Sequence, residues 1–345
     1  MPAVFDGHND ALTRPDHARL ATGRRGGHLD LPRMRAGGVR GGIFAVFTES
    51  AVGGREERVP RDDGVIEFRP AAPVPHQVAA ANAAAAAGRL LGLERAGALR
   101  VARRIADVDG AREGDGAPVA VLHLEGAEAI DPGLESLELW HAGGLRSLGP
   151  AWSRGNAFAE GVPFLSPASP DTGPGLSEAG RALIRRCAAL GIMVDVSHLN
   201  EAGFWDVARL EPGPIVASHS AVHALCPSSR NLTDAQLDEI GASGGLVGIV
   251  FACPFLRADF ADDPDTPLSV VAEHARYVAA RIGVEHVALG SDFDGATIPA
   301  PLGDVSGMPR LLEALEHAGF TAAELSLIAW ENWRRVLAAW WGPDR

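Results

Sequence analysis

Histidine and acidic residues recur in this sequence at the points where short apolar runs end. His8 and Asp10 follow the first run, two positions apart, so in an extended strand their side chains point the same way. Glu125, His198 and His219 end three later runs. Imidazole nitrogen and carboxylate oxygen are suitable ligands for zinc. Packing does not explain this set, because burying several unpaired charges would cost several kcal/mol each.

The absence of lysine limits the kinds of metal centre that this sequence can form. All 31 basic residues are arginine, which excludes a carbamylated-lysine bridge, a Schiff base and a Walker-A loop. Two neighbouring cations need an anionic bridge, and Glu125 is the central candidate. His8 and Asp10 then complete the shell of one zinc ion, and His198 and His219 that of the other. A water or hydroxide held between the ions, its pKa lowered towards ~7, becomes the nucleophile.

A further acidic residue, Asp292, ends the last apolar run. Because other residues supply the metal ligands, Asp292 is free to act as general base and then to give its proton to the leaving amine. Each residue also has an ordinary interpretation, since a lone histidine is usually a core or surface residue and a strand-end carboxylate often caps a helix. His123 is either a neighbour of the metal site or a core histidine. The conjunction at five strand ends favours a metal site.

The elements that must bring these residues together are eight apolar runs of strand length, separated by helical stretches. Near-continuous apolar runs are typical of parallel strands buried on both faces. Ser177 and Gly191 mark the ends of one intervening helix, and capping boxes begin others at Thr233 and Thr321. This alternation predicts a parallel α/β fold, and eight strands favour a closed (β/α)8 TIM barrel. The runs are 4–5, 42–47, 119–124, 145–148, 192–196, 214–217, 246–251 and 287–289.

An open doubly wound sheet is the competing fold. It should have a glycine-rich phosphate turn after the first strand, whereas a His-Asn-Asp sequence stands there. In a barrel, the carboxyl ends of all strands meet at one mouth, which is where the polar residues fall. We therefore predict one barrel domain over residues 1–345, with irregular insertions at about 51–75 and 153–175. Four tryptophans near the end of the chain indicate packing or a subunit contact.

Composition excludes several classes of function. With 44 acidic and 31 basic residues the net charge is -13, which argues against binding to nucleic acid. The three cysteines are too scattered for a disulfide framework or a cysteine metal site. The sequence begins with no signal peptide, and no apolar run approaches the ~18 residues that span a bilayer. We expect a cytoplasmic protein without a membrane partner.

Taken in order, the motifs resemble those of the renal (membrane) dipeptidase family of zinc peptidases, peptidase family M19 of the amidohydrolase superfamily. The resemblance runs from residue 4 to about residue 336. It implies a binuclear zinc barrel that hydrolyses dipeptides, including those with a D residue at the C-terminal position, and that forms a homodimer. The motifs are DGHND at 6–10, LEG at 124–126, DVSH at 195–198, ASHS at 217–220, SRN at 229–231 and GSDFDG at 290–295.

The resemblance also assigns roles to individual residues. His8 and Asp10 match the ligands of the first zinc ion and Glu125 matches the bridge. His198 and His219 match the ligands of the second zinc ion.

Two further residues match positions that act on the substrate. Asp292 matches the proton-transfer aspartate, and Arg230 matches the arginine that receives the terminal carboxylate of the substrate. A guanidinium fork suits that role because it binds a carboxylate bidentately.

One position departs from the family. Trp152 stands where the family usually has a histidine that polarises the scissile carbonyl. Either Arg154, Asn156 or a zinc ion takes over that role, or the substrate has changed, because an indole N–H donates a hydrogen bond but cannot become cationic. We expect Trp152 and Asn156 to contact the substrate.

Two other functions stay open at this point. A binuclear metal amidohydrolase could hydrolyse N-acyl amino acids or lactams with the same ligands, and Arg230 would then have no dipeptide carboxylate to bind. A non-catalytic metal-binding barrel should have lost a ligand or the base, and all six positions are filled.

Overall fold

The computed structural model describes residues 2–51, 58–68, 71–113 and 116–342. Eight parallel strands form its centre, five in a six-stranded sheet (β1-β2-β6-β7-β9) and three in another (β10-β11-β12). The sixth strand of the first sheet, β5 (Arg100–Val101), pairs with the start of β6. Each of the eight corresponds to one of the apolar runs in the sequence. The eight are β1 (Val4–Asn9), β2 (Val39–Phe47), β6 (Val119–Glu125), β7 (Leu145–Gly149), β9 (Met193–Val194), β10 (Val216–Ser220), β11 (Leu246–Ile249) and β12 (Val287–Leu289).

Two isolated bridges join the sheets into a closed barrel. One pairs Asp195 with Val216, directly after β9. The other pairs Asn9 with Phe293, beside a 2.8 Å hydrogen bond from the Asp10 N–H to the Phe293 carbonyl. The strands therefore follow one another round the barrel in chain order. The (β/α)8 prediction is confirmed, and the open sheet is excluded.

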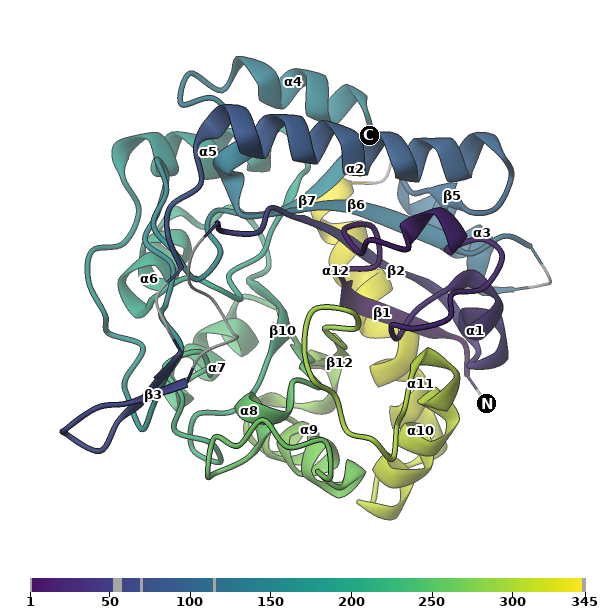
Figure 1. Ribbon diagram of the computed structural model, residues 1–345. Coiled ribbons are helices and arrows are strands. Elements are labelled where there is room, and N and C mark those ends of the chain that lie inside the picture. Colours follow the sequence, from purple (N-terminus) through teal and green to yellow (C-terminus); the bar gives the residue numbers. More distant parts are fainter. Residues whose placement is uncertain (1, 52–57, 69–70, 114–115, 343–345) are drawn as a thin grey trace.

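Helices surround the barrel (Figure 1). They are α1 (Leu31–Ala36), α2 (His76–Arg95), α3 (Ile105–Arg112), α4 (Glu135–Ala142), α5 (Glu178–Leu190), α6 (Glu201–Leu210), α7 (Asp234–Ala242), α8 (Cys253–Leu256), α9 (Leu268–Ile282), α10 (Met308–His317), α11 (Ala322–Ser326) and α12 (Asn332–Trp341). Helix α5 begins after the N-cap Ser177 and ends at Gly191, whose φ of 70° favours glycine. Thr233 and Thr321 form the two predicted capping boxes. Among the described residues, no helix has both the length and the apolar character that crossing a membrane requires.

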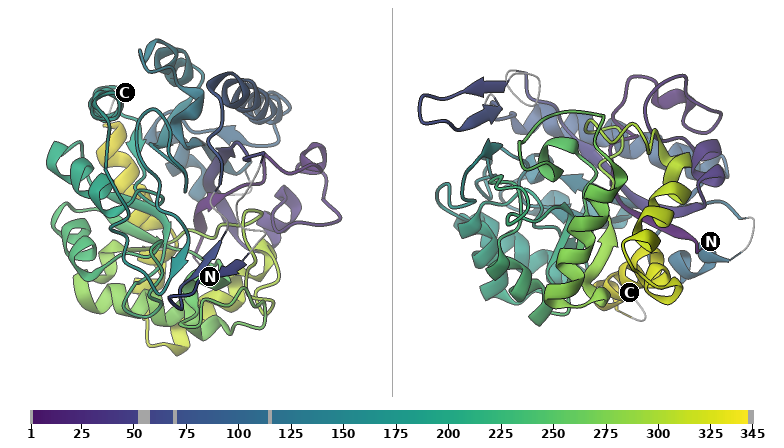
Figure 2. Two further views of the ribbon diagram at one scale, coloured as in Figure 1. Left: turned by 60° about the vertical axis from the view of Figure 1, so that its left-hand side comes forward. Right: turned by 90° about the horizontal axis from the view of Figure 1, so that it is seen from below.

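The two insertions expected to be irregular pair with each other in a small antiparallel sheet. Its strands are β3 (Arg58–Pro60), β4 (Ile66–Phe68) and β8 (Leu165–Ser166). Strand β4 bridges the insertions, since Glu67 pairs with Leu165. The β3–β4 hairpin projects from the body of the molecule (Figure 2). Strands this short have too few residues for an alternating pattern, so the sequence did not reveal them. Residues 52–57 and 69–70 of the first insertion lie outside the described residues.

The tryptophans near the end of the chain pack inside it. Trp330, Trp333 and Trp341 are at most 1% exposed, and Trp340 is 6% exposed. Trp333 donates to the Leu289 carbonyl at 2.9 Å. The packing interpretation is therefore correct, and a subunit contact through these rings is excluded because they are buried within the chain.

Candidate active site

The five predicted metal ligands meet at the carboxyl end of the barrel. His8 lies on β1 with Asp10 just beyond it, Glu125 is the last residue of β6, His198 follows β9, and His219 lies on β10. All five are buried. The Glu125 Oε1 atom lies 2.9 Å from His198 Nε2 and 3.6 Å from His8 Nε2. It also lies 3.6 Å from His219 Nε2, so Glu125 stands at the centre of the set.

Asp292 joins this set through a second group of potential ligands. Side-chain atoms of His8, Asp10 and Asp292 lie within 4.8 Å of one another, as do those of His8, Glu125 and His219. Asp292 has a φ of 59°, a strained conformation for a residue with a side chain, and its N–H donates to the His8 carbonyl at 3.1 Å. A Cβ at Gly295 would lie 2.1 Å from Asp10 and 2.2 Å from Asp292. Position 295 must therefore be glycine for the Asp10 and Asp292 carboxylates to occupy these places.

The charge balance of the site fits a divalent metal. Burial and the negative charge of Glu125 raise the pKa of Asp10 to about 7. Burial alone would lower the pKa of His8, but the charges of Glu125 and Asp10 raise it well above 6.5. Within the described residues, neither ring nitrogen of His8 has a hydrogen-bond partner. A carboxylate short of positive charge, that of Asp10, and a buried imidazole without a hydrogen bond are the surroundings that a metal ion would complete.

Serine hydroxyls orient two of the histidines, a role that we did not predict. Ser153 Oγ lies 2.8 Å from His198 Nδ1, and Ser218 Oγ lies 2.8 Å from His219 Nδ1. The single proton of the Ser218 hydroxyl goes to Asp195, so this oxygen accepts from the Nδ1–H of His219. His219 Nε2 is thereby left with its lone pair for a metal. The position of Ser218 directly before His219 in the sequence is the feature from which this role could have been predicted.

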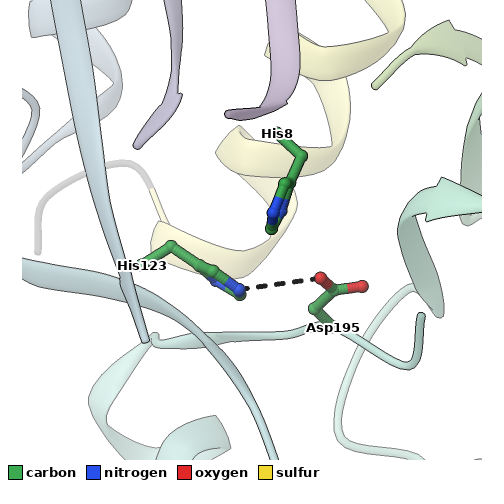
Figure 3. Close-up of side chains that lie close together, drawn as sticks. All are labelled: His8, His123 and Asp195. Carbon is green, nitrogen blue, oxygen red and sulfur yellow. Dashed lines mark ion pairs between the residues drawn. The ribbon is translucent and has the colours of Figure 1, made fainter. Parts of the chain in front are cut away.

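His123 lies beneath the site, beside Asp195 (Figure 3). Its Nδ1 atom is 2.8 Å from Ser147 Oγ, and its Nε2 atom is 3.8 Å from Asp195 Oδ2. Burial lowers the pKa of His123 to about 4, so the ring is neutral at pH 7. Together with His8, these two residues form a third group of potential ligands. His123 is therefore both a core histidine and a neighbour of the candidate metal site.

Arg230 is held close to the metal-ligand set. Its Nη1 atom donates to Ser220 Oγ at 2.7 Å, and its Nη2 atom donates to the His219 carbonyl at 2.8 Å. The guanidinium carbon also lies 5.7 Å from the centre of the Phe255 ring. The residue is 3% exposed. These contacts fix a cation beside His219.

Trp152 lines the mouth of the barrel. Its ring centre lies 5.7 Å from that of His198 and 4.9 Å from that of Phe47. It borders a cavity of about 730 Å³ that Asp10 and Glu125 also line. The indole is thus placed where a substrate bound to the ligand set would meet it.

The two other candidates on this loop are occupied by contacts within the chain. The Asn156 amide donates to the Pro150 carbonyl at 2.9 Å and accepts from the N–H groups of Phe158 and Ala159. Arg154 donates to Glu128, Ser50 and Thr48, and it is buried. Neither lines the two cavities described for this end of the barrel. Substrate contact by Asn156 therefore stays a prediction that this structure does not support.

Comparison with known proteins agrees with the site. The sequence profile described as membrane dipeptidase (peptidase family M19) matches residues 2–340. The chain belongs to the membrane dipeptidase family. It is 31% identical to the dipeptidase aclJ of Aspergillus oryzae over 97% of this chain and 74% of that protein. It is 48% identical to an uncharacterised protein of the Klebsiella pneumoniae pqqA 5′ region, over 71% of this chain and 90% of that one.

Solved structures of this family have the same fold. A metallopeptidase from Rhodobacter sphaeroides, solved with a phosphinate mimic of the dipeptide L-Ala-D-Ala, superposes with a TM-score of 0.93. It is 44% identical, and the match covers 99% of both chains. A second family M19 dipeptidase superposes with a TM-score of 0.91, also at 44% identity over 99% of both chains. The protein is thus a metal-dependent dipeptidase whose substrates are small peptides, and the non-catalytic interpretation falls.

Proposed function

We propose that this enzyme is a zinc dipeptidase with two zinc ions per chain, bridged by Glu125. The observation that carries the proposal is the central position of Glu125, whose Oε1 atom lies within 3.6 Å of three imidazole nitrogens. His8 and Asp10 form the ligands on one side of it, and His198 and His219 those on the other. Nitrogen and oxygen donors without thiolate suit zinc.

Three further residues of the site then have roles in hydrolysis. When bound, the zinc ions lower the pKa of a water molecule and polarise the scissile carbonyl. Arg230 binds the C-terminal carboxylate of the dipeptide and so sets its distance from the reacting bond. The Asp292 carboxylate accepts a proton from the attacking water and gives it to the departing amine nitrogen. Trp152 covers one side of the site and keeps bulk water away.

We further propose that the substrates include dipeptides with a D residue at the C-terminal position. The Rhodobacter sphaeroides relative was solved with a mimic of such a dipeptide, and its fold and length match those of this chain. Arg230 would hold the C-terminal residue through its backbone carboxylate, a group that L and D residues share.

The test is amine release by the zinc-loaded enzyme from L-L, L-D and D-L dipeptides, with tripeptides and N-acyl amino acids alongside. Cleavage of dipeptides with resistance of tripeptides is the expected result. Cleavage of N-acyl amino acids alone would replace the proposal with the amidohydrolase alternative, with Trp152 marking the changed substrate.

A further inference from the structure

We propose that the enzyme prefers dipeptides with an acidic side chain on the N-terminal residue, recognised by Arg14 and Arg89. This selectivity rests on the proposed dipeptide hydrolysis and adds a substrate class to it. The inference comes from the two cavities beside the metal-ligand set, whose volumes are about 730 Å³ and 540 Å³. Arg14, Asp294 and Gly295 line both cavities, so the two are neighbours.

Arg230 decides which side chain of a dipeptide faces which cavity. Its guanidinium lies over the ring of Phe255, and Phe255 lines the smaller cavity. A dipeptide whose terminal carboxylate is bound by Arg230 therefore has its C-terminal residue on that side. The larger cavity, which Asp10 and Glu125 border, is left for the N-terminal side chain.

The two cavities differ in chemistry. Three phenylalanines line the smaller one, Phe68, Phe164 and Phe255. Its charged lining residues are Arg14, Asp262 and Asp294. Arg14, from the loop after β1, lines both cavities, and the larger one has a second guanidinium group, that of Arg89 from α2. A side chain that carries negative charge is the natural complement of two guanidinium groups that line one cavity.

Both arginines are available to a ligand. Arg89 is held in place through Nη1, which donates to the Leu12 carbonyl at 2.9 Å, and its other donors are not committed by any described contact. Within the described ranges, the Arg14 side chain has no ion pair or hydrogen bond. An arginine without an ion pair among the described residues can pair with the substrate.

The acidic residues that line the larger cavity do not cancel these charges. Asp10 and Glu125 belong to the proposed metal-ligand set, and Asp294 forms a buried ion pair with Arg24. Glu49 is the remaining acidic residue among the described lining residues. A dipeptide has an N-terminal ammonium group, and Glu49 is the carboxylate available to bind it. The two arginines are then left for a side-chain carboxylate.

The experiment compares kcat/KM of the zinc-loaded enzyme for Glu-Ala, Gln-Ala and Lys-Ala, each in its L-L and L-D forms. Glutamate and glutamine differ in charge but hardly in shape, so their ratio isolates the charge. We expect Glu-Ala to exceed Gln-Ala by about tenfold or more. Arg14→Gln and Arg89→Gln should each lower this ratio, and Arg14→Glu should shift the preference towards Lys-Ala. Arg185→Gln, at an exposed arginine of α5, is the matched control and should keep the wild-type ratio.

Two results would overturn the inference alone. One is hydrolysis of all three dipeptides with a Glu-Ala to Gln-Ala ratio near one. The other is a high ratio that survives in both Arg14→Gln and Arg89→Gln. Failure to hydrolyse any dipeptide would instead reject the proposed function together with the selectivity. Since Arg14 is exposed, Arg14→Gln should fold normally, and its melting temperature checks this.

Discussion

Two polar side chains at the amino end of the barrel and one at the carboxyl end are buried in opposite ways. At the amino end, the Asn332 amide donates to the Val284 and Val287 carbonyls at 2.9 and 2.8 Å, and His286 Nδ1 lies 2.7 Å from the Gly245 carbonyl. At the carboxyl end, neither nitrogen of His8 has a hydrogen-bond partner among the described residues. Buried polar groups that the chain itself satisfies hold the fold together, whereas groups left for an outside partner mark the functional end.

Removal of the metal should have the largest effect, and it should affect activity at the carboxyl end without affecting the fold. A chelator should reduce dipeptide hydrolysis by about a thousandfold or more, because the water then has no cation to lower its pKa. The fold should persist, since the amino end and the apolar core need no metal. Amine release and circular dichroism, before and after zinc is restored, measure both effects. Full activity in verified metal-free protein would contradict the comparison.

Asp292→Asn should be the next most severe change. The amide cannot accept the proton from water, so kcat should fall by ~10²-fold or more while the bound zinc is retained. Kinetics together with metal analysis by mass spectrometry check the prediction. Near-normal turnover would remove Asp292 from the mechanism, and loss of zinc would make it a ligand instead.

Ser218→Ala should weaken zinc binding by about 10–100-fold, because the Nδ1–H of His219 loses the acceptor that fixes its tautomer. Competition with a chelator measures the affinity directly. Ser326→Ala is the control, since that hydroxyl bonds only within its own helix turn. Equal zinc affinity in the two variants would show that Ser218 does not orient the ligand.

Arg230→Ala should raise KM for dipeptides by about tenfold or more, with a smaller effect on kcat, because a charged hydrogen bond to the carboxylate is lost. Steady-state kinetics with free and C-terminally amidated dipeptides test this. For the amidated substrate, KM should change little in the variant. An unchanged KM for the free dipeptide would exclude Arg230 from carboxylate binding.

Asn332→Ala, at the opposite end, should leave kcat/KM unchanged and lower the free energy of unfolding by about 1–3 kcal/mol. Two buried backbone carbonyls then lose their donor. Urea denaturation measures the loss. A large fall in activity of the folded variant would mean that the amino end also takes part in function.

The sequence was enough to predict the barrel and to name the five residues that the structure brings together at its carboxyl end. Continuous apolar runs revealed the eight strands, and the alternation of side chains placed His8 and Asp10 together. It did not reveal strands β3, β4 and β8, because each has two or three residues and they pair across long distances in the chain. The larger cavity was also hidden, since Arg89 reaches it from a helix far from the motifs.

Trp152 and Asn156 show where sequence reasoning stops. Both stand on the same loop and both were expected to contact the substrate. Trp152 lines the larger cavity, whereas the Asn156 amide is used up by three hydrogen bonds to its own loop. The conformation of the loop decides which of these two residues makes hydrogen bonds to the backbone. No local sequence pattern encodes that conformation.

The most direct test of the central claim is anomalous diffraction at the zinc edge from crystals of the zinc-loaded protein. We predict two peaks per chain, one on either side of the Glu125 carboxylate. The first should contact His8 and Asp10, and the second His198 and His219. A single peak, or a peak between His123 and Asp195 in place of one beside Glu125, would contradict the account.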